Sequence, residues 1–160
     1  EFTALWYADS LYVACQQYQP DILIGHSAGG MASLFLLTHF QVSSIQQVVC
    51  LGAPSDVANV LEKFSNFLGL WQPTRKVLTA YFEDIFQKPV AYYSMANFVK
   101  ELKVSGIIVH DEEDKDVPFS EGGKIARNYV AAEFIRTKGL GHSLNDTQLI
   151  KQIVGKLKKD

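Results

Sequence analysis

The chain has 160 residues, of which 48% are hydrophobic and 20% charged, and its formal net charge is −2. A chain of this length buries one core, so we expect a single domain spanning 1–160. The mean hydropathy of +0.02 argues against a disordered chain, and the balanced charge against a nucleic-acid partner. No apolar run reaches the roughly 18 to 20 residues that cross a bilayer, so no membrane partner is expected either.

The two cysteines, Cys15 and Cys50, fall in a helical pattern and in an apolar strand, as small core residues do. Buried free thiols fit a reducing compartment, so the expected location is cytoplasmic. No set of His and Cys has the spacing of metal ligands, and the GxGxxG spacing of a dinucleotide site is missing. The sequence therefore predicts neither a metal nor a cofactor.

The first forty residues predict a helix, a strand and a second helix. The helix over 3–17 is predicted by apolar residues at three- and four-residue steps: Leu5, Ala8, Leu11, Tyr12 and Cys15. A short apolar strand follows over 21–24, and after a turn of small residues a second helix is expected over 28–39.

The later part of the chain alternates between strands and helices. Apolar, partly β-branched strands are predicted over 47–51 and 104–110, and a weaker one over 132–137. Helical patterns over 124–130 and 145–158 separate or follow them. Alternation of this kind is typical of βαβ units, so we predict an α/β fold with a parallel sheet flanked by helices.

The segment 55–101 interrupts this alternation, because it predicts two or three helices and no strand. It is rich in aromatic residues: Phe64, Phe67, Trp71, Tyr81, Phe82, Phe86, Tyr92, Tyr93 and Phe98. One interpretation is an ordinary helical core. The other is a helical cap insertion whose inner face lines an apolar pocket, with Trp71 and Tyr81 as substrate-binding residues.

A GxSxG motif, Gly25-His26-Ser27-Ala28-Gly29, stands between the strand over 21–24 and the helix after it. A sharp strand-to-helix turn of this kind holds the serine above the sheet, which makes Ser27 the candidate nucleophile. The N–H of Ala28 lies at a helix N-terminus and is the candidate oxyanion donor. His26 is a candidate substrate-binding residue, and the alternative to the whole site is a glycine-rich turn with an idle serine.

A nucleophilic serine needs a base, and the base needs an orienting carboxylate. The stretch 110–118 leaves a buried strand and carries five carboxylates. Its pattern, a histidine, an aspartate four residues later and then x-x-Val-Pro, resembles the acid loop of α/β-hydrolases. The resemblance implies that Asp114 is the acid, while Asp111 and Asp116 remain weaker candidates. The alternative is a solvated acidic loop.

A Gly-Leu-Gly-His sequence over 139–142 resembles the histidine loop of the same superfamily. The resemblance implies that His142 is the base. The order of Ser27, Asp114 and His142 along the chain is that of α/β-hydrolases and differs from that of chymotrypsin-like and subtilisin-like enzymes.

The chain departs from the superfamily pattern before Ser27. Complete members have several strands upstream of the nucleophile, and a loop after one of them supplies a second oxyanion donor. Here only one helix precedes the strand over 21–24, so the fold is expected to be a truncated α/β-hydrolase fold. The strand would then be an apolar sheet edge (Asp21, Ile22, Leu23 and Ile24), which favours a homodimer formed across it.

The resemblance and the motifs together predict a serine hydrolase that cleaves small to medium apolar carboxylic esters through an acyl-enzyme intermediate. Two alternatives remain open. One is a non-catalytic remnant with an interaction role. The other is a hydrolase-fold enzyme with different chemistry, such as a perhydrolase or an enzyme that cleaves phosphotriesters.

Overall fold

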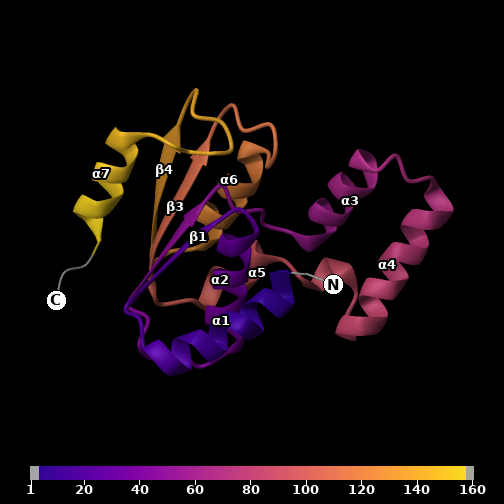
Figure 1. The fold of residues 1–160 in the computed structure, drawn as a ribbon, viewed down its shortest axis with the longest axis horizontal. Coiled ribbons are helices and arrows are strands. Elements are labelled where there is room, and N and C mark those ends of the chain that lie inside the picture. Colours follow the sequence, from indigo (N-terminus) through magenta and orange to yellow (C-terminus); the bar gives the residue numbers. More distant parts are fainter. Residues whose placement is uncertain (1–3, 158–160) are drawn as a thin grey trace.

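The computed structural model describes residues 4–157 and has a four-stranded parallel sheet at its centre (Figure 1). The strands are β1 (Ile22–His26), β2 (Gln47–Leu51), β3 (Ser105–Asp111) and β4 (Ala132–Thr137), and they lie side by side in chain order. The prediction of an α/β fold with a parallel sheet is therefore confirmed.

The helices of the αβ alternation are α1 (Ala4–Tyr18), α2 (Ala28–His39), α6 (Phe119–Asn128) and α7 (Thr147–Lys156). The predicted bounds of α2 are those observed, and the predicted first helix ends one residue before α1 does. Thr3 of that prediction, and residue 158 of the predicted last helix, lie outside the described residues. The predicted helix over 124–130 was misplaced, because α6 begins five residues earlier, directly after Pro118. The last helix was predicted too long, since α7 begins after its N-cap Asp146, whose side chain accepts a hydrogen bond from Leu149 N.

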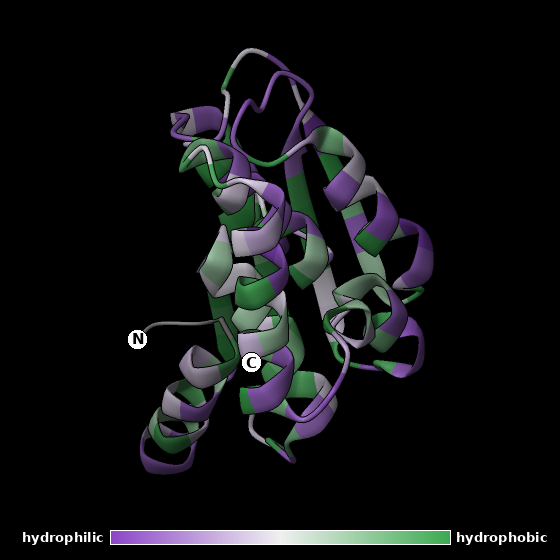
Figure 2. Cartoon of the chain, turned by 90° about the vertical axis from the view of Figure 1, so that its right-hand side faces the viewer, coloured by the Kyte–Doolittle hydropathy of each residue, from purple (hydrophilic) through white to green (hydrophobic). Residues whose placement is uncertain are grey.

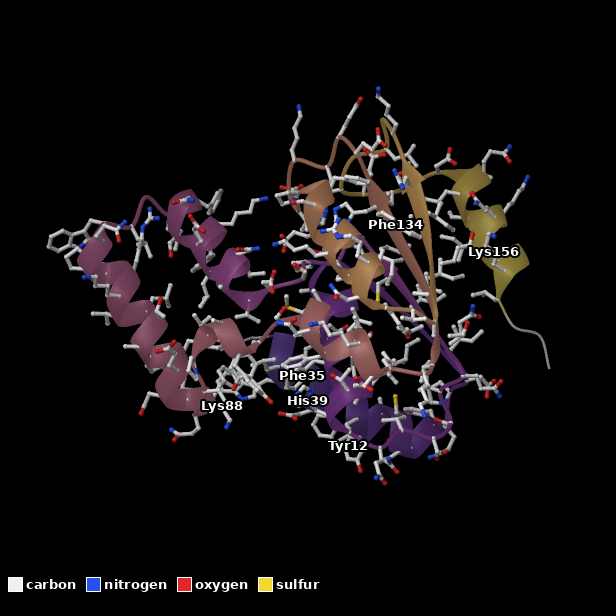
Figure 3. All side chains as sticks on the ribbon, turned by 180° about the vertical axis from the view of Figure 1, so that it is seen from behind. Tyr12, Phe35, His39, Lys88, Phe134 and Lys156 are labelled. Atoms are coloured by element: carbon white, nitrogen blue, oxygen red, sulfur yellow. The ribbon has the colours of Figure 1, made fainter. Side chains whose placement is uncertain are left out.

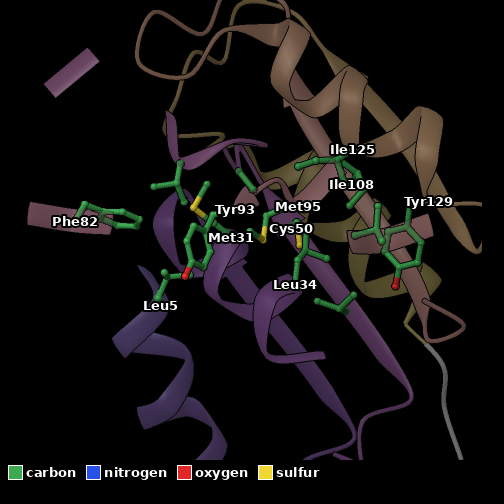
Figure 4. Close-up of a cluster of buried hydrophobic side chains, with 14 residues drawn as sticks. Leu5, Met31, Leu34, Cys50, Phe82, Tyr93, Met95, Ile108, Ile125 and Tyr129 are labelled. Atoms are coloured by element: carbon green, nitrogen blue, oxygen red, sulfur yellow. The ribbon is translucent and has the colours of Figure 1, made fainter. Parts of the chain in front are cut away.

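The core has a layer on each face of the sheet, because alternate strand residues point to opposite sides. On one face, strand residues pack against α2, α6 and the short helix at 95–98 in a cluster (Figure 4): Met31, Leu34, Val48, Cys50, Met95, Val99, Ile108, Ile125 and Tyr129. On the other face, strand residues pack against α7: Val49, Ile107, Val109, Ile135, Leu149 and Ile153. The hydrophobic colours gather on the strands between these helices (Figure 2).

Between β2 and β3 the chain forms a helical segment, residues 55–101. It consists of α3 (Val57–Phe67), α4 (Gln72–Phe86), η1 (Val90–Tyr92), α5 (Met95–Phe98) and η2 (Val99–Glu101). Helices α3 and α4 form a hairpin that extends away from the sheet, with their connection at the far end (Figure 1). Within α2 the ring of Phe35 stacks on His39 (Figure 3). The segment contacts α2 here, because the ring of Phe98 meets that of His39 edge-on.

A buried carboxylate joins the start of the helical segment to α6. The oxygens of Glu121 accept hydrogen bonds from Ser55 N, Ser55 Oγ, Asn59 Nδ2 and Lys124 Nζ, and Lys124 also pairs with Asp56. Burial alone would raise the pKa of Glu121, but these hydrogen bonds outweigh it and hold the pKa below its ordinary value.

The variant Glu121→Gln is therefore expected to be less stable, by about 1–3 kcal/mol, because it leaves buried donors without an acceptor. Urea unfolding at neutral pH measures the difference. Because the folded-state pKa of Glu121 is depressed, its stabilisation is present above its unfolded-state pKa and is lost as pH falls through the folded value. The difference in the free energy of unfolding between Glu121→Gln and the wild type should thus become smaller at acidic pH.

The control is Glu133→Gln, which breaks the exposed pair between Glu133 and Lys156. Because Glu133 is 50% exposed, this loss is expected to stay within about 0.5 kcal/mol. Equal losses in the two variants would contradict the role given to Glu121.

Candidate active site

The three predicted catalytic residues follow three strands of the sheet at the same edge. Ser27 follows β1, Asp114 lies in the loop after β3, and His142 lies in the loop after β4. In a parallel sheet the carboxyl ends of the strands meet at one edge, where α/β proteins place their sites. The fold thus brings together residues that are up to 115 positions apart.

Ser27 occupies a strained turn between β1 and α2. Its backbone has φ 54° and ψ −121°, a combination that costs free energy for any residue but glycine. The turn is held by hydrogen bonds from Ser27 N to Leu51 O (2.8 Å) and from Gly30 N to Ser27 O (3.0 Å). Ala28 is the first residue of α2, where a backbone N–H has no acceptor within its helix.

Close packing around this turn requires two of its glycines. A Cβ atom on Gly25 would lie 2.5 Å from the carbonyl of Gly29, and one on Gly30 would lie 2.8 Å from Cβ of Ala53. Both distances are shorter than real Cβ contacts. The small residues therefore let the chain turn sharply enough to project the serine.

Asp114 has a buried side chain with every oxygen engaged. Its Oδ1 accepts from the backbone N–H groups of Asp116 and Val117, both at 2.8 Å, and its Oδ2 accepts from Nδ1 of His142 at 2.8 Å. Burial acts to raise the pKa of Asp114, but the bond with His142 and the two backbone bonds prevail, so the pKa lies below its ordinary value. The group is held as a carboxylate.

This hydrogen bond fixes the tautomer of His142. A carboxylate oxygen can only accept, so Nδ1 of His142 carries the proton and Nε2 is left as a lone pair that can take one. A second contact holds His142 near the serine turn: His26 Nε2 donates to the backbone carbonyl of His142 at 2.7 Å, and the two imidazole rings lie 4.8 Å apart. His26 thus bonds to the histidine loop from the residue before Ser27.

Within residues 4–157, Ser27 Oγ makes no hydrogen bond with His142. Catalytic hydrogen bonds are often long in unliganded enzymes and tighten once substrate binds. The geometry therefore places the hydrogen-bonded pair of Asp114 and His142 next to the serine turn.

Of the two weaker acid candidates, neither is bonded to His142 in the described part of the chain. Asp116 is exposed and pairs with Lys63. Asp111 is fully buried and bonds to Thr137 and to Leu140 N. Of the three aspartates, Asp114 is the one whose side chain contacts His142.

The one group of possible metal ligands found within residues 4–157 is Asp114, Asp116 and His142, whose ligand atoms lie within 4.8 Å of one another. Yet Oδ1 and Oδ2 of Asp114 already accept three hydrogen bonds, and Nδ1 of His142 carries a proton. Two of the three members of this group are therefore joined by a direct hydrogen bond.

Gly52, directly after β2, is a site residue that the sequence did not reveal. It has φ +57°, and a Cβ there would lie 3.3 Å from Nδ1 of His142 and 3.5 Å from Oδ2 of Asp114. The backbone therefore passes close beneath the acid–base pair. The one available signal was a glycine at the end of an apolar strand, which also marks ordinary turns.

The predicted substrate-binding residues of the helical segment lie on the α3–α4 hairpin. Trp71 is in its connection, 70% exposed, and Tyr81 is on α4, 50% exposed. The connection lies far from the sheet (Figure 1). The substrate-binding role of both residues stays a prediction. The described helices include none that is both long and apolar enough to pass through a membrane.

The sheet order, the serine turn and the acid–base pair together define a protein of the α/β-hydrolase superfamily. More specifically, the chain belongs to the family of PGAP1-like alpha/beta domains, whose family model matches residues 3–104. This match includes Ser27 and ends before Asp114 and His142. No curated protein matches the chain.

Solved structures of the same fold match nearly the whole chain. An esterase from Exiguobacterium antarcticum superposes with a TM-score of 0.68 at 14% sequence identity, and the match covers 96% of this chain and 73% of the esterase. For the esterase domain of a Rhodothermus marinus protein the TM-score is 0.66 and the identity 22%, with 96% of this chain and 68% of that domain covered. For Est816, described as an N-acyl homoserine lactone degrading enzyme, the TM-score is 0.70 and the identity 14%, with 98% of this chain and 76% of Est816 covered. The chain thus spans about 70% of these hydrolase structures.

Proposed function

We propose that the chain is a serine hydrolase that cleaves carboxylic esters through an acyl-enzyme intermediate. The observation that carries this proposal is the 2.8 Å bond from His142 Nδ1 to buried Asp114, next to a serine in a strained turn. Strain at Ser27 and a buried, paired carboxylate both cost free energy, and a catalytic role accounts for that cost.

In the proposed reaction, Ser27 Oγ attacks the ester carbonyl while Nε2 of His142 takes the hydroxyl proton. The oxyanion is stabilised by the N–H of Ala28 at the N-terminus of α2. Collapse of the tetrahedral intermediate expels the alcohol, which receives the proton from His142. Water, deprotonated by the same Nε2, then releases the acid and regenerates Ser27, while Asp114 keeps the imidazole oriented.

A small to medium apolar ester is the proposed substrate. The α3–α4 hairpin exposes apolar side chains in an unusual number: Val60, Phe64, Phe67, Leu68, Trp71, Val77 and Tyr81. A helical cap with such a surface offers contacts to an apolar acyl or alcohol group. Similar folds include esterases and the lactone-degrading Est816, which supports ester chemistry without naming a substrate.

Labelling with a fluorophosphonate probe tests the proposal. The probe reacts with activated serines, and mass spectrometry locates the modified residue. We expect modification at Ser27 in the wild type and none in Ser27→Ala, with Ser143 and the other serines unmodified in both. No labelling of a folded wild type would instead favour a non-catalytic interaction protein.

A second assay separates hydrolysis from other hydrolase-fold chemistry. The rate of p-nitrophenyl butyrate hydrolysis is measured with and without hydrogen peroxide, and beside it the rate with a phosphotriester. The proposed esterase needs no peroxide and prefers the carboxylic ester. A peroxide-dependent product would point to a perhydrolase. Faster turnover of the phosphotriester than of the carboxylic ester would point to an enzyme that cleaves phosphotriesters.

We also propose that two copies pair across the edge of β1. Among residues 4–157 this strand has a neighbouring strand on one side only. Ile24, which lies beside Val49 on the face covered by α7, is 59% exposed. Pairing across a two-fold axis would bury this apolar edge. Sedimentation equilibrium is expected to give twice the chain mass, and Ile24→Lys to give the monomer. A monomeric wild type would contradict the pairing.

A further inference from the structure

We infer that Asp111 is a positioning residue that fixes the acid loop and the histidine loop relative to each other, so that His142 contacts Asp114. The inference deepens the proposed function and rests on it. Asp111 is the last residue of β3, and its side chain is fully buried at the edge of the sheet. It lies three residues before Asp114, and in the described part of the chain it makes no hydrogen bond to His142.

The two oxygens of Asp111 bind different segments. Oδ1 accepts from the backbone N–H of Glu113 at 2.9 Å, in the acid loop. Oδ2 accepts from Thr137 Oγ1 at 2.8 Å, at the end of β4, and from the backbone N–H of Leu140 at 3.0 Å, in the histidine loop. One carboxylate therefore bridges the residue before Asp114 and the residue two before His142.

The histidine loop needs hydrogen bonds of this kind to keep one conformation. Gly139 and Gly141, on either side of Leu140, both have positive φ, +83° and +60°, so the loop is built from residues with broad conformational freedom. Burial works to raise the pKa of Asp111, but bonds from Leu140, Thr137 and the neighbouring backbone lower it overall. The bridge is thus an ionised acceptor that accepts charge-assisted hydrogen bonds.

An asparagine cannot replace this carboxylate. It has one acceptor oxygen and one NH₂ group, and the backbone donors of Glu113 and Leu140 sit on opposite oxygens of Asp111. Whichever way the amide turns, one backbone N–H faces the NH₂ group. Asp111→Asn therefore releases either the acid loop or the histidine loop, while volume and shape stay the same.

The test compares Asp111→Asn with Glu112→Gln, which removes an exposed carboxylate one residue away. Asp111→Asn is expected to lower kcat for p-nitrophenyl butyrate by about 10- to 100-fold, the effect of misplaced catalytic groups, with KM changed less than threefold. Glu112→Gln should leave both constants unchanged. Equal kcat in Asp111→Asn and wild type would overturn the inference.

A spectroscopic readout separates positioning from mere stability. In protein with ¹⁵N-labelled histidine, the Nδ1–H signal of His142, assigned by its loss in His142→Ala, reports the bond to Asp114. We expect it to shift or broaden in Asp111→Asn and to stay in place in Glu112→Gln. An unmoved signal in folded Asp111→Asn would overturn the inference.

Two further results keep the outcomes distinct. If Asp111→Asn does not fold, Thr137→Val takes its place, because it removes one donor to Asp111 and keeps the carboxylate. The kcat of Thr137→Val should fall by about fivefold, as for the loss of one net hydrogen bond. An unchanged kcat together with an unmoved His142 signal would overturn the inference. If the wild type neither labels nor hydrolyses the ester, the proposed function fails, and the His142 signal alone still decides the role of Asp111.

Discussion

Removing Ser27 and His142 together is expected to cost no more activity than removing either one. In a Ser–His pair the serine is nucleophilic only when the histidine takes its proton, so each single alanine variant should lose nearly all of the chemical step. For residues that act as such a unit the loss in kcat is about a million-fold, and the double variant loses about the same. Rates of p-nitrophenyl butyrate hydrolysis for Ser27→Ala, His142→Ala and the double variant measure this.

The matched control is His26→Ala, because His26 also lies at the turn and contacts the histidine loop, yet has no proton-transfer role in the mechanism. It loses one hydrogen bond to the carbonyl of His142, so its kcat should fall by about tenfold at most. Losses that add in the double variant would mean that Ser27 and His142 do not act as a pair. A drop in His26→Ala as large as in His142→Ala would make His26 a candidate for the base.

The sheet was predictable because its strands are short, apolar and bounded by turn residues. The predicted strands over 47–51 and 132–137 coincide with β2 and β4, and the other two are displaced by one or two residues. The start of α6 was missed because Gly122 and Gly123 disfavour a helix in sequence terms. The structure explains Gly122, since a Cβ there would clash with the buried ring of His110.

Residues of the candidate site were predictable only where they belong to a short sequence motif. Ser27, Asp114 and His142 each sit in a short pattern, and the structure places Asp114 and His142 in contact. Residues that act through distant bonds have no such pattern. Asp111 bonds to residues 26 and 29 positions away, so a sequence scan gives it no more weight than the carboxylates beside it.

Asp114→Asn is expected to lower kcat by about ten thousand-fold while leaving the fold intact. An amide at this position can donate an N–H to Nδ1 of His142, so Nδ1 must then carry the lone pair. The imidazole proton moves to Nε2, and the nitrogen that faces Ser27 can no longer accept the serine proton. Asp116→Asn is the control, since Asp116 is exposed and its side chain pairs with Lys63; its kcat should change less than about threefold, as for a surface pair.

The pH dependence adds a second check on Asp114. Because the folded-state pKa of Asp114 is depressed, the carboxylate stays charged down to below the ordinary range of aspartate. Protonation of Asp114 should therefore not contribute to the acidic loss of kcat/KM within the ordinary pKa range of aspartate. A step in that range that disappears in Asp114→Asn would contradict the lowered pKa of Asp114. Full activity in Asp114→Asn would mean that another carboxylate orients His142, and Asp116 would be the next residue to replace, because its carboxylate lies within 4.8 Å of a ring nitrogen of His142.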